Sequence, residues 1–203
     1  MRKIVCFLGL PGSGKSTYAD RLAVERGYRF LREGATQLIY EKGFRPGKDA
    51  PFEFDRAILD KNVNMAKDIL RMEKPDVIIF EGGPVSDMLF AAARSKLGKQ
   101  KDSRRGILDG YNHQAIQSLI ENSKFVIFNL PPGISLNRQE DRNKPELMTP
   151  DIDVLDFVHK GLMEFYRNNK DKVAVINIMG KSEDEVYVEV TQKLDAILQA
   201  CSR

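Results

Sequence analysis

The sequence predicts an α/β fold, in which a five-stranded parallel sheet carries helices on both faces. Short apolar runs alternate along the chain with longer segments of helical periodicity, and this alternation is typical of parallel sheets. The third and fifth runs are apolar almost throughout, as expected for strands that are covered on both faces. The 203 residues show no internal repeat and no linker, so residues 1–203 are expected to form one domain.

The expected strands are the apolar runs Ile4–Leu8, Tyr28–Leu31, Val77–Phe80, Phe125–Leu130 and Val173–Ile178. Amphipathic stripes predict core-facing helices over 54–72, 152–165 and 186–197.

Two of these helices have recognisable start signals. Thr149 and Pro150 offer an N-cap followed by a proline in the first turn. Ser182 and Glu185 have the spacing of a capping box. Ligands of such sheets bind beyond the carboxyl ends of the strands, where we expect the irregular segments 42–51, 98–106 and 143–150 to gather.

The composition is that of an ordinary soluble domain, with 42% hydrophobic and 30% charged residues. The net charge of +3 is too small to make nucleic acid the expected ligand. No stretch approaches the roughly 20 apolar residues of a membrane helix, and the run near Met1 is too short for a signal peptide. Cys6 and Cys201 form neither a disulfide framework nor a metal-binding pattern. We therefore expect a cytoplasmic protein that does not contact membranes.

Residues Gly9–Ser16, here called the phosphate loop, fit the pattern G-x-x-x-x-G-K-[ST] without a mismatch. Its glycines let the backbone curl around a phosphate, so that successive N–H groups form an anion-binding nest at a helix N-terminus. Lys15 would reach the outer phosphates of ATP, and Ser16 would place its hydroxyl on Mg²⁺. The residues expected to contact the nucleotide are Gly9, Leu10, Pro11, Gly12, Ser13, Gly14, Lys15, Ser16 and Thr17.

Two glutamates directly follow expected strands. Glu81 ends an apolar run and has the position of an acid that holds Mg²⁺ through its water shell. Glu33 follows the second strand, where it would accept a proton from an attacking hydroxyl. The alternatives are a solvated strand end for Glu81 and an ion pair with Arg32 for Glu33.

Three arginines are candidates for contacts with phosphate. Arg56 would hold an anionic group of the acceptor, or is a surface charge. Arg138 and Arg142 share a helix face at the start of an expected lid over about 138–150. They would neutralise the charge of the transition state, or form a solvated basic helix end. The basic stretch 96–105 is read as a solvated loop.

The chain resembles the thymidylate kinases and the related deoxynucleoside kinases. The resemblance is carried, in order, by the phosphate loop, Arg32–Thr36, Phe54–Ala57, Val77–Glu81 with Ser86 and Asp87, Phe128–Pro132 and Leu136–Arg142. It implies a P-loop kinase fold with a lid, ATP and Mg²⁺ as cofactors, a small-molecule acceptor and room for a homodimer. It also implies that Arg56 touches the acceptor's phosphate and that Ser86 and Asp87 lie in the acceptor site.

The acceptor stays open. Gly82 stands where both families place an arginine, and Gly34 and Ala35 depart from the thymidylate kinase pattern. The match of Arg56 favours a nucleoside monophosphate, which arrives largely deprotonated and needs cationic positioning. Glu33 suits the alternative, a hydroxyl acceptor such as a nucleoside, another metabolite or a polynucleotide end. A third reading is an ATPase or switch that acts on a macromolecular partner through the basic stretch 96–105.

Overall fold

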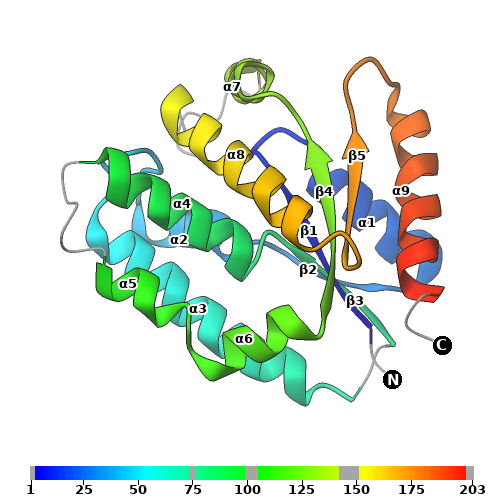
Figure 1. Cartoon of the computed structure of the whole chain (residues 1–203), viewed down its shortest axis with the longest axis horizontal. Coiled ribbons are helices and arrows are strands. Elements are labelled where there is room, and N and C mark those ends of the chain that lie inside the picture. The colour runs from blue at the N-terminus through cyan, green and yellow to red at the C-terminus, as the bar shows by residue number, and fades with distance from the viewer. Residues whose placement is uncertain (1–2, 74–75, 99–104, 142–150, 200–203) are drawn as a thin grey trace.

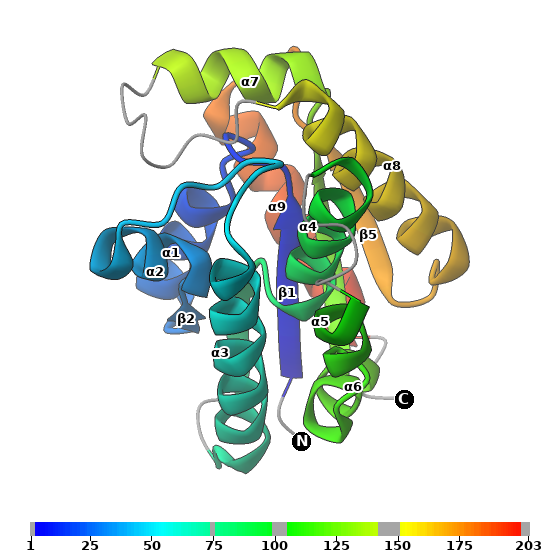
Figure 2. The ribbon, with the colours of Figure 1, turned by 90° about the vertical axis from the view of Figure 1, so that its left-hand side faces the viewer.

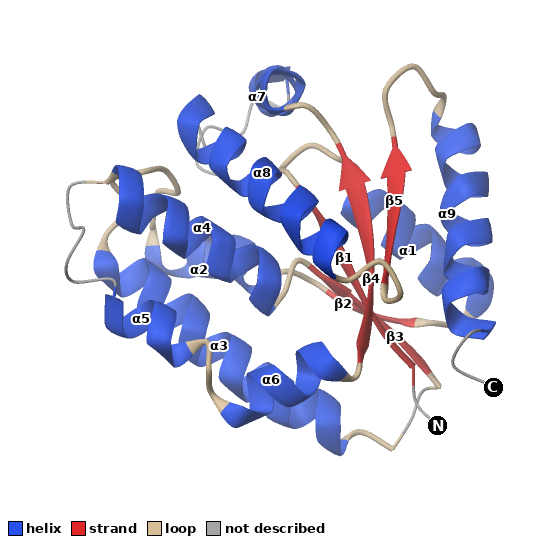
Figure 3. Ribbon diagram, in the orientation of Figure 1, coloured by secondary structure: helices blue, strands red, loops and turns tan. Residues whose placement is uncertain are grey.

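The sheet of this protein contains five parallel strands in the order β2-β3-β1-β4-β5. A computed structural model describes residues 3–73, 76–98, 105–141 and 151–199 (Figures 1 and 3). The strands are β1 (Lys3–Gly9), β2 (Arg29–Leu31), β3 (Val77–Glu81), β4 (Ser123–Asn129) and β5 (Val173–Asn177). All five expected strands are therefore confirmed, with small shifts at their ends.

Helices cover both faces of the sheet, as the alternating pattern predicted (Figures 1 and 2). They are α1 (Lys15–Arg26), α2 (Gly34–Lys42), α3 (Phe52–Arg71), α4 (Pro84–Leu97), α5 (Arg105–Gly110), α6 (Gln114–Glu121), α7 (Pro132–Asp141), α8 (Ile152–Asn168) and α9 (Glu183–Gln199).

The alternation of side chains along β1 divides the core into two layers. Ile4, Cys6 and Leu8 pack into the layer formed with α3, α4, α6 and α8. Val5 and Phe7 point to the opposite face and pack against α1 and α9. Because β1 is buried on both faces, its apolar residues leave no polar face, which explains the uninterrupted run in the sequence.

The expected helix starts differ in outcome. The capping box of α9 is confirmed, since the Ser182 N–H donates to Glu185 Oε2 at 2.7 Å and the Glu185 N–H donates to Ser182 Oγ at 3.3 Å. Helix α8 begins at Ile152, with Asp151 at the N-cap position. Thr149 and Pro150 lie outside the described residues.

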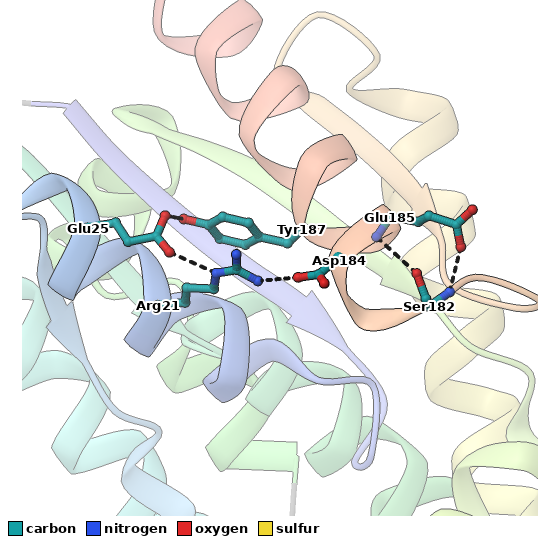
Figure 4. A network of polar contacts seen from close by, with 6 residues as sticks. All are labelled: Arg21, Glu25, Ser182, Asp184, Glu185 and Tyr187. Carbon is teal, nitrogen blue, oxygen red and sulfur yellow. Dashed lines mark hydrogen bonds and ion pairs between the residues drawn. The ribbon is translucent and has the colours of Figure 1, made fainter.

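Polar contacts join α1 to α9 at the surface (Figure 4). The Arg21 guanidinium lies over the Tyr187 ring, 3.8 Å from its centroid, and donates to Glu25 and Asp184 at 2.8 Å each. The Tyr187 hydroxyl donates to Glu25 at 2.6 Å. These contacts hold the C-terminal helix against the helix that follows the phosphate loop.

Within the ranges that the structure describes, no helix has both the length and the apolar character needed to cross a membrane.

The core position of α1 can be tested with two substitutions on the same helix. Leu22 is fully buried between α1 and the sheet, whereas Val24 is 86% exposed. We expect Leu22→Ala to lower the free energy of unfolding by about 2–5 kcal/mol, because it removes buried methyl groups and leaves a cavity. Val24→Ala is expected to change it by less than about 0.5 kcal/mol. Urea unfolding measures both, and equal effects would contradict this packing.

Candidate active site

The phosphate loop connects the end of β1 to the first turn of α1. Gly9 has φ 149° and Gly14 has φ 85°, backbone conformations that favour glycine. A Cβ on Gly9 would lie 2.7 Å from the carbonyl oxygen of Phe128, and one on Gly14 would lie 2.8 Å from the Tyr18 ring. Both glycines are therefore required by close packing as well as by backbone conformation.

Lys15 is held inside the loop that precedes it. Its ammonium group donates to the carbonyl oxygens of Gly9 at 2.9 Å and Leu10 at 3.1 Å. The side chain is buried, so its charge acts with little solvent screening. This places a cation beside the backbone amides of the loop, as expected for a site that binds the outer phosphates of a nucleotide.

Ser16 and Glu81 meet across the site, since the Ser16 hydroxyl donates a hydrogen bond to the Glu81 carboxylate. One residue comes from the start of α1 and the other from the end of β3. A hydroxyl and a carboxylate are the hard oxygen ligands that Mg²⁺ uses together with phosphate oxygens. The pair therefore fits the magnesium role predicted for it. Among the described residues, no group of three or more His, Cys, Asp or Glu side chains could hold a metal ion by itself.

A cavity of about 380 Å³ opens from the phosphate loop toward α2, α3 and α4. Apolar side chains from these helices form much of its wall, namely Ile39, Tyr40, Phe54, Ile58 and Phe90. Its polar lining includes Lys15, Ser16, Thr17, Arg32, Glu33, Glu81, Ser86, Asp87 and Arg94. A concave site that combines apolar and polar lining in this way can hold a small molecule with hydrogen-bonding groups.

Two carboxyl groups of this cavity have raised pKa values. Burial raises the pKa of Glu33 to about 8, with further contributions from Asp87 and Glu81 that the Lys15 ammonium opposes. Burial also raises the pKa of Asp87 to about 6, although a hydrogen bond from Asn62 and the nearby Arg94 lower it. Perturbed carboxyl groups in a cavity are typical of functional sites. The structure thus places Glu33, Glu81 and Asp87, three of the candidate site residues, in the lining of one cavity.

Two buried polar contacts join α3 to α4 at the wall of the cavity, and the sequence did not reveal them. Arg94 donates through Nε to Asp55 at 2.9 Å and also through Nη2. Asn62 donates to Asp87 Oδ2 at 2.8 Å. In each helix the two polar residues are seven positions apart, so they share one face of an apolar stripe. This seven-residue spacing of polar residues was the feature of the sequence that could have revealed the two contacts.

Tyr111 is a further polar residue beside these two contacts. It is almost fully buried, and its hydroxyl lies close to Asn62 and to the carboxyl groups of Asp87 and Asp55. Burial and the charges of Asp87 and Asp55 raise its pKa well above the ordinary value, so the hydroxyl stays protonated.

The structure corrects the expectation for Arg56. Its side chain is 61% exposed, pairs with Asp60 at 3.4 Å and does not line the cavity. Asp55, one position earlier, faces inward instead and binds Arg94. A shift of one residue in a helix rotates a side chain by about 100°, and the sequence alone did not decide which residue faces the site.

Helix α7 lies against the phosphate loop and carries the predicted lid arginine. Arg138 donates to the Gly12 carbonyl at 3.2 Å, and Ser135 donates to the Pro11 carbonyl at 2.6 Å. A second cavity of about 320 Å³ lies beside this contact, lined by Gly14, Tyr18, Arg138, Asp141, Ile178 and Lys181 among others. Arg142 and most of the predicted lid lie outside the described residues.

Residues 43–51 are irregular, as the sequence predicted for 42–51, and only Lys42 belongs to α2. Pro46 of this segment lines the cavity. The segment is anchored at Lys48, whose backbone N–H donates to Asp151 at 2.8 Å. Of the basic stretch 96–105, Lys96 lies 5.5 Å from the Phe157 ring centroid, and residues 99–104 lie outside the described ranges.

The buried pair Arg94–Asp55 can be compared with the exposed pair Arg56–Asp60. The side chains of Arg94 and Asp55 are 3% and 1% exposed. We expect Arg94→Leu to lower the free energy of unfolding by about 3–5 kcal/mol, because it leaves the buried Asp55 carboxylate without its guanidinium. Arg56→Ala is expected to change it by less than about 0.5 kcal/mol. Denaturant unfolding measures both changes, and an equally small effect of Arg94→Leu would contradict the burial of the Arg94–Asp55 pair.

Known proteins resemble this chain both in sequence and in fold. The sequence model of a family described as "AAA domain" matches residues 4–119, more than half of the chain. Human adenylate kinase isoenzyme 5 is 26% identical over 210 residues, an alignment that covers 96% of this chain and 33% of that protein. The chain thus spans about a third of the length of this curated relative.

Solved structures of similar fold include deoxyadenosine kinase from M. mycoides with the products dCMP and a flexible dCDP (TM-score 0.71, 18% identity). The same kinase with bound dATP has a TM-score of 0.72 and 19% identity. Each comparison covers 96% of this chain and 100% of the other. The chain therefore belongs to the AAA domain family, and its fold is that of a nucleoside- and nucleotide-kinase-like P-loop protein.

Proposed function

We propose that this protein transfers the terminal phosphate of ATP to a hydroxyl group of a nucleoside-like acceptor. The observation that carries the proposal is the position of Glu33, a carboxyl group of raised pKa in the cavity that opens from the phosphate loop. The names of similar proteins, an adenylate kinase and a deoxyadenosine kinase, support an acceptor of the nucleoside or nucleotide class.

The donor end is formed by the phosphate loop and Lys15, which would bind the outer phosphates of ATP. Ser16 and Glu81 would hold Mg²⁺, which would supply positive charge that offsets the charge of the phosphates. The second cavity adjoins the loop on the side of α7 and α9, and it offers space for the nucleoside end of the donor. Arg138 would turn from the Gly12 carbonyl to the transferring phosphate.

The charge balance of the acceptor cavity favours a hydroxyl over a phosphate. Arg94 is neutralised by Asp55, and Arg32 pairs with Asp20 at 2.8 Å on the rim. Glu33 and Asp87 remain as carboxyl groups toward the acceptor, where a phosphate dianion would be repelled when they ionise. Arg56 does not compensate, because it lies outside the cavity. Of the acceptors that the sequence left open, the geometry therefore supports a hydroxyl.

Glu33 would act as the general base. Its carboxylate accepts the proton of the acceptor hydroxyl while that oxygen bonds to the terminal phosphorus, and the bond from this phosphorus to the bridging oxygen breaks to release ADP. A base whose pKa lies near the working pH combines a usable ionised fraction with good proton affinity. Lys15 and Arg138 stabilise the charge that develops on the phosphate oxygens.

The far end of the cavity suits a planar group with hydrogen-bonding edges. Phe54 and Phe90 supply aromatic walls, and Arg94 lies 5.5 Å and 5.8 Å from the centroids of their rings. Asp87 is fixed by Asn62 and is suited to accept a hydrogen bond from a ring or amino N–H of the acceptor.

Cytoplasmic location, the single domain, the homodimer and the lid remain predictions.

A phosphate-transfer panel tests the proposal. Purified protein with Mg·ATP is assayed against nucleosides, nucleoside monophosphates and 5′-hydroxyl oligonucleotides. We expect nucleosides to be phosphorylated. Lys15→Ala is expected to lower kcat/KM by about 10²–10³-fold, and Glu33→Gln by about 10²–10⁴-fold, because they remove charge stabilisation and the base.

Arg56→Ala is the matched control, because it removes a cation from outside the cavity, and its kcat/KM should stay within about twofold of the wild type. If monophosphates are the better substrates and Glu33→Gln is fully active, the hydroxyl acceptor is wrong. Transfer to oligonucleotides alone would favour a polynucleotide end, and hydrolysis without transfer would favour an ATPase.

The pH dependence of the reaction tests the role of Glu33 separately. The pKa of about 8 reflects burial first, then Asp87, with Lys15 opposing and Glu81 adding. Only the ionised carboxylate accepts a proton, so kcat/KM should rise roughly tenfold per pH unit below this pKa and level off above it. Glu33→Gln should lose this rise. A flat wild-type profile between pH 6 and 8, or the same rise in Glu33→Gln, would assign the base elsewhere.

A further inference from the structure

We infer that Ser135 is a positioning residue for the phosphate loop: its hydroxyl fixes the Pro11 carbonyl and so aims the Gly12 amide toward the bound phosphate. The inference rests on the proposed binding of ATP at this loop, but not on the identity of the acceptor. Ser135 belongs to α7, more than 120 positions away from the loop in the sequence, and no sequence motif assigns it a role.

Ser135 is fully buried, and its hydroxyl donates to the Pro11 carbonyl oxygen at 2.6 Å. The hydroxyl is itself oriented, since Gln139 Nε2 lies 3.4 Å from Ser135 Oγ and 3.3 Å from the Ser135 carbonyl oxygen. With Gln139 donating to it, the Ser135 oxygen acts as an acceptor there and its proton is directed to Pro11. This is a built contact rather than a surface serine that happens to face the loop.

The geometry of the peptide unit carries this contact to the amide of the next residue. The peptide between Pro11 and Gly12 is planar and trans, so its C=O and N–H point in opposite directions. Because the Pro11 oxygen points at α7, the Gly12 N–H points away from α7. Fixing the carbonyl therefore fixes the direction of an amide in the anion-binding nest.

The Gly12 N–H is placed to donate a hydrogen bond to a ligand. Gly12 is buried and lines both cavities that flank the loop. Its N–H has no backbone acceptor among the described residues, whereas the N–H of the next residue, Ser13, donates to the Leu10 carbonyl at 3.2 Å. An N–H that lines a cavity and has no backbone acceptor is able to donate to an incoming phosphate oxygen.

The same helix also contacts the following peptide unit. Arg138 donates to the Gly12 carbonyl at 3.2 Å, and a Cβ on Gly12 would lie 3.1 Å from the Arg138 Cβ. When Arg138 turns to the transferring phosphate, the Gly12 carbonyl loses this donor. The Ser135 hydroxyl has no such second task, so it holds the loop while Arg138 moves.

The test compares two buried serines. Ser123 is 1% exposed, and its hydroxyl also donates to a backbone carbonyl, that of Leu119, at 2.6 Å. It lies at the amino end of β4, at the edge of the sheet opposite to the phosphate loop. Ser135→Ala and Ser123→Ala each remove a buried hydroxyl that donates to a backbone carbonyl, so both are expected to lower Tm. Ser135→Ala also removes the weaker contact at 3.4 Å from Gln139.

Calorimetry with Mg·ATP, without acceptor, measures the effect on the loop. We expect Ser135→Ala to raise the Kd for Mg·ATP about tenfold, equivalent to about 1.4 kcal/mol, and Ser123→Ala to change it less than twofold. In the kinetic assay, KM for the acceptor should stay unchanged in both variants. Equal Kd values in the two variants would overturn the inference, and so would a Ser135→Ala variant that loses only acceptor affinity.

Ser135→Thr keeps the hydroxyl and separates hydrogen bonding from packing. We expect it to keep the wild-type Kd within about threefold, and a loss of ATP binding as large as that of Ser135→Ala would overturn the role of the hydroxyl. The proposed function fails differently. If the wild type does not bind Mg·ATP, both proposals fall, whereas binding without phosphate transfer removes only the proposed function and leaves the Ser135 comparison valid.

Discussion

The arrangement of the site depends on one constraint, the sharp turn of the backbone where central strand β1 meets α1. That turn needs glycines, because Gly9 packs against β4 and Gly14 packs against the Tyr18 ring without room for a Cβ. Once the turn is made, the Lys15 ammonium folds back onto the carbonyl oxygens of Gly9 and Leu10. The neighbouring strands then bring their own end residues to the same edge.

Glu81 illustrates this convergence. It ends β3, which pairs directly with β1, and the register places Phe7 of β1 opposite it. The carboxylate thus reaches Ser16 in the first turn of α1 without a long or flexible connection. Glu33 follows β2 on the other side of β3 and enters the same cavity. Because these strands are parallel, the phosphate loop, Glu81 and Glu33 all lie at the same end of the sheet.

The part of the cavity away from the phosphate loop is built differently, from helix faces rather than strand ends. Helices α3 and α4 each place two polar side chains in an otherwise apolar interface, and these pair as Arg94 with Asp55 and Asn62 with Asp87. Such buried contacts are weak evidence for stability, since desolvation offsets much of their attraction. Their effect here is to fix Arg94 and Asp87 in the wall of the cavity, with burial raising the pKa of Asp87.

The sequence by itself determined the five strands, the phosphate loop, and the positions of Glu33 and Glu81, because strand periodicity and glycine-rich turns are local properties. It did not determine which face of α3 lines the cavity, and the Arg56 that it singled out lies on the exposed face. Nor could it show that Ser135 of α7 reaches Pro11. Those outcomes depend on how helices rotate and pack against distant segments, and only the tertiary structure decides that.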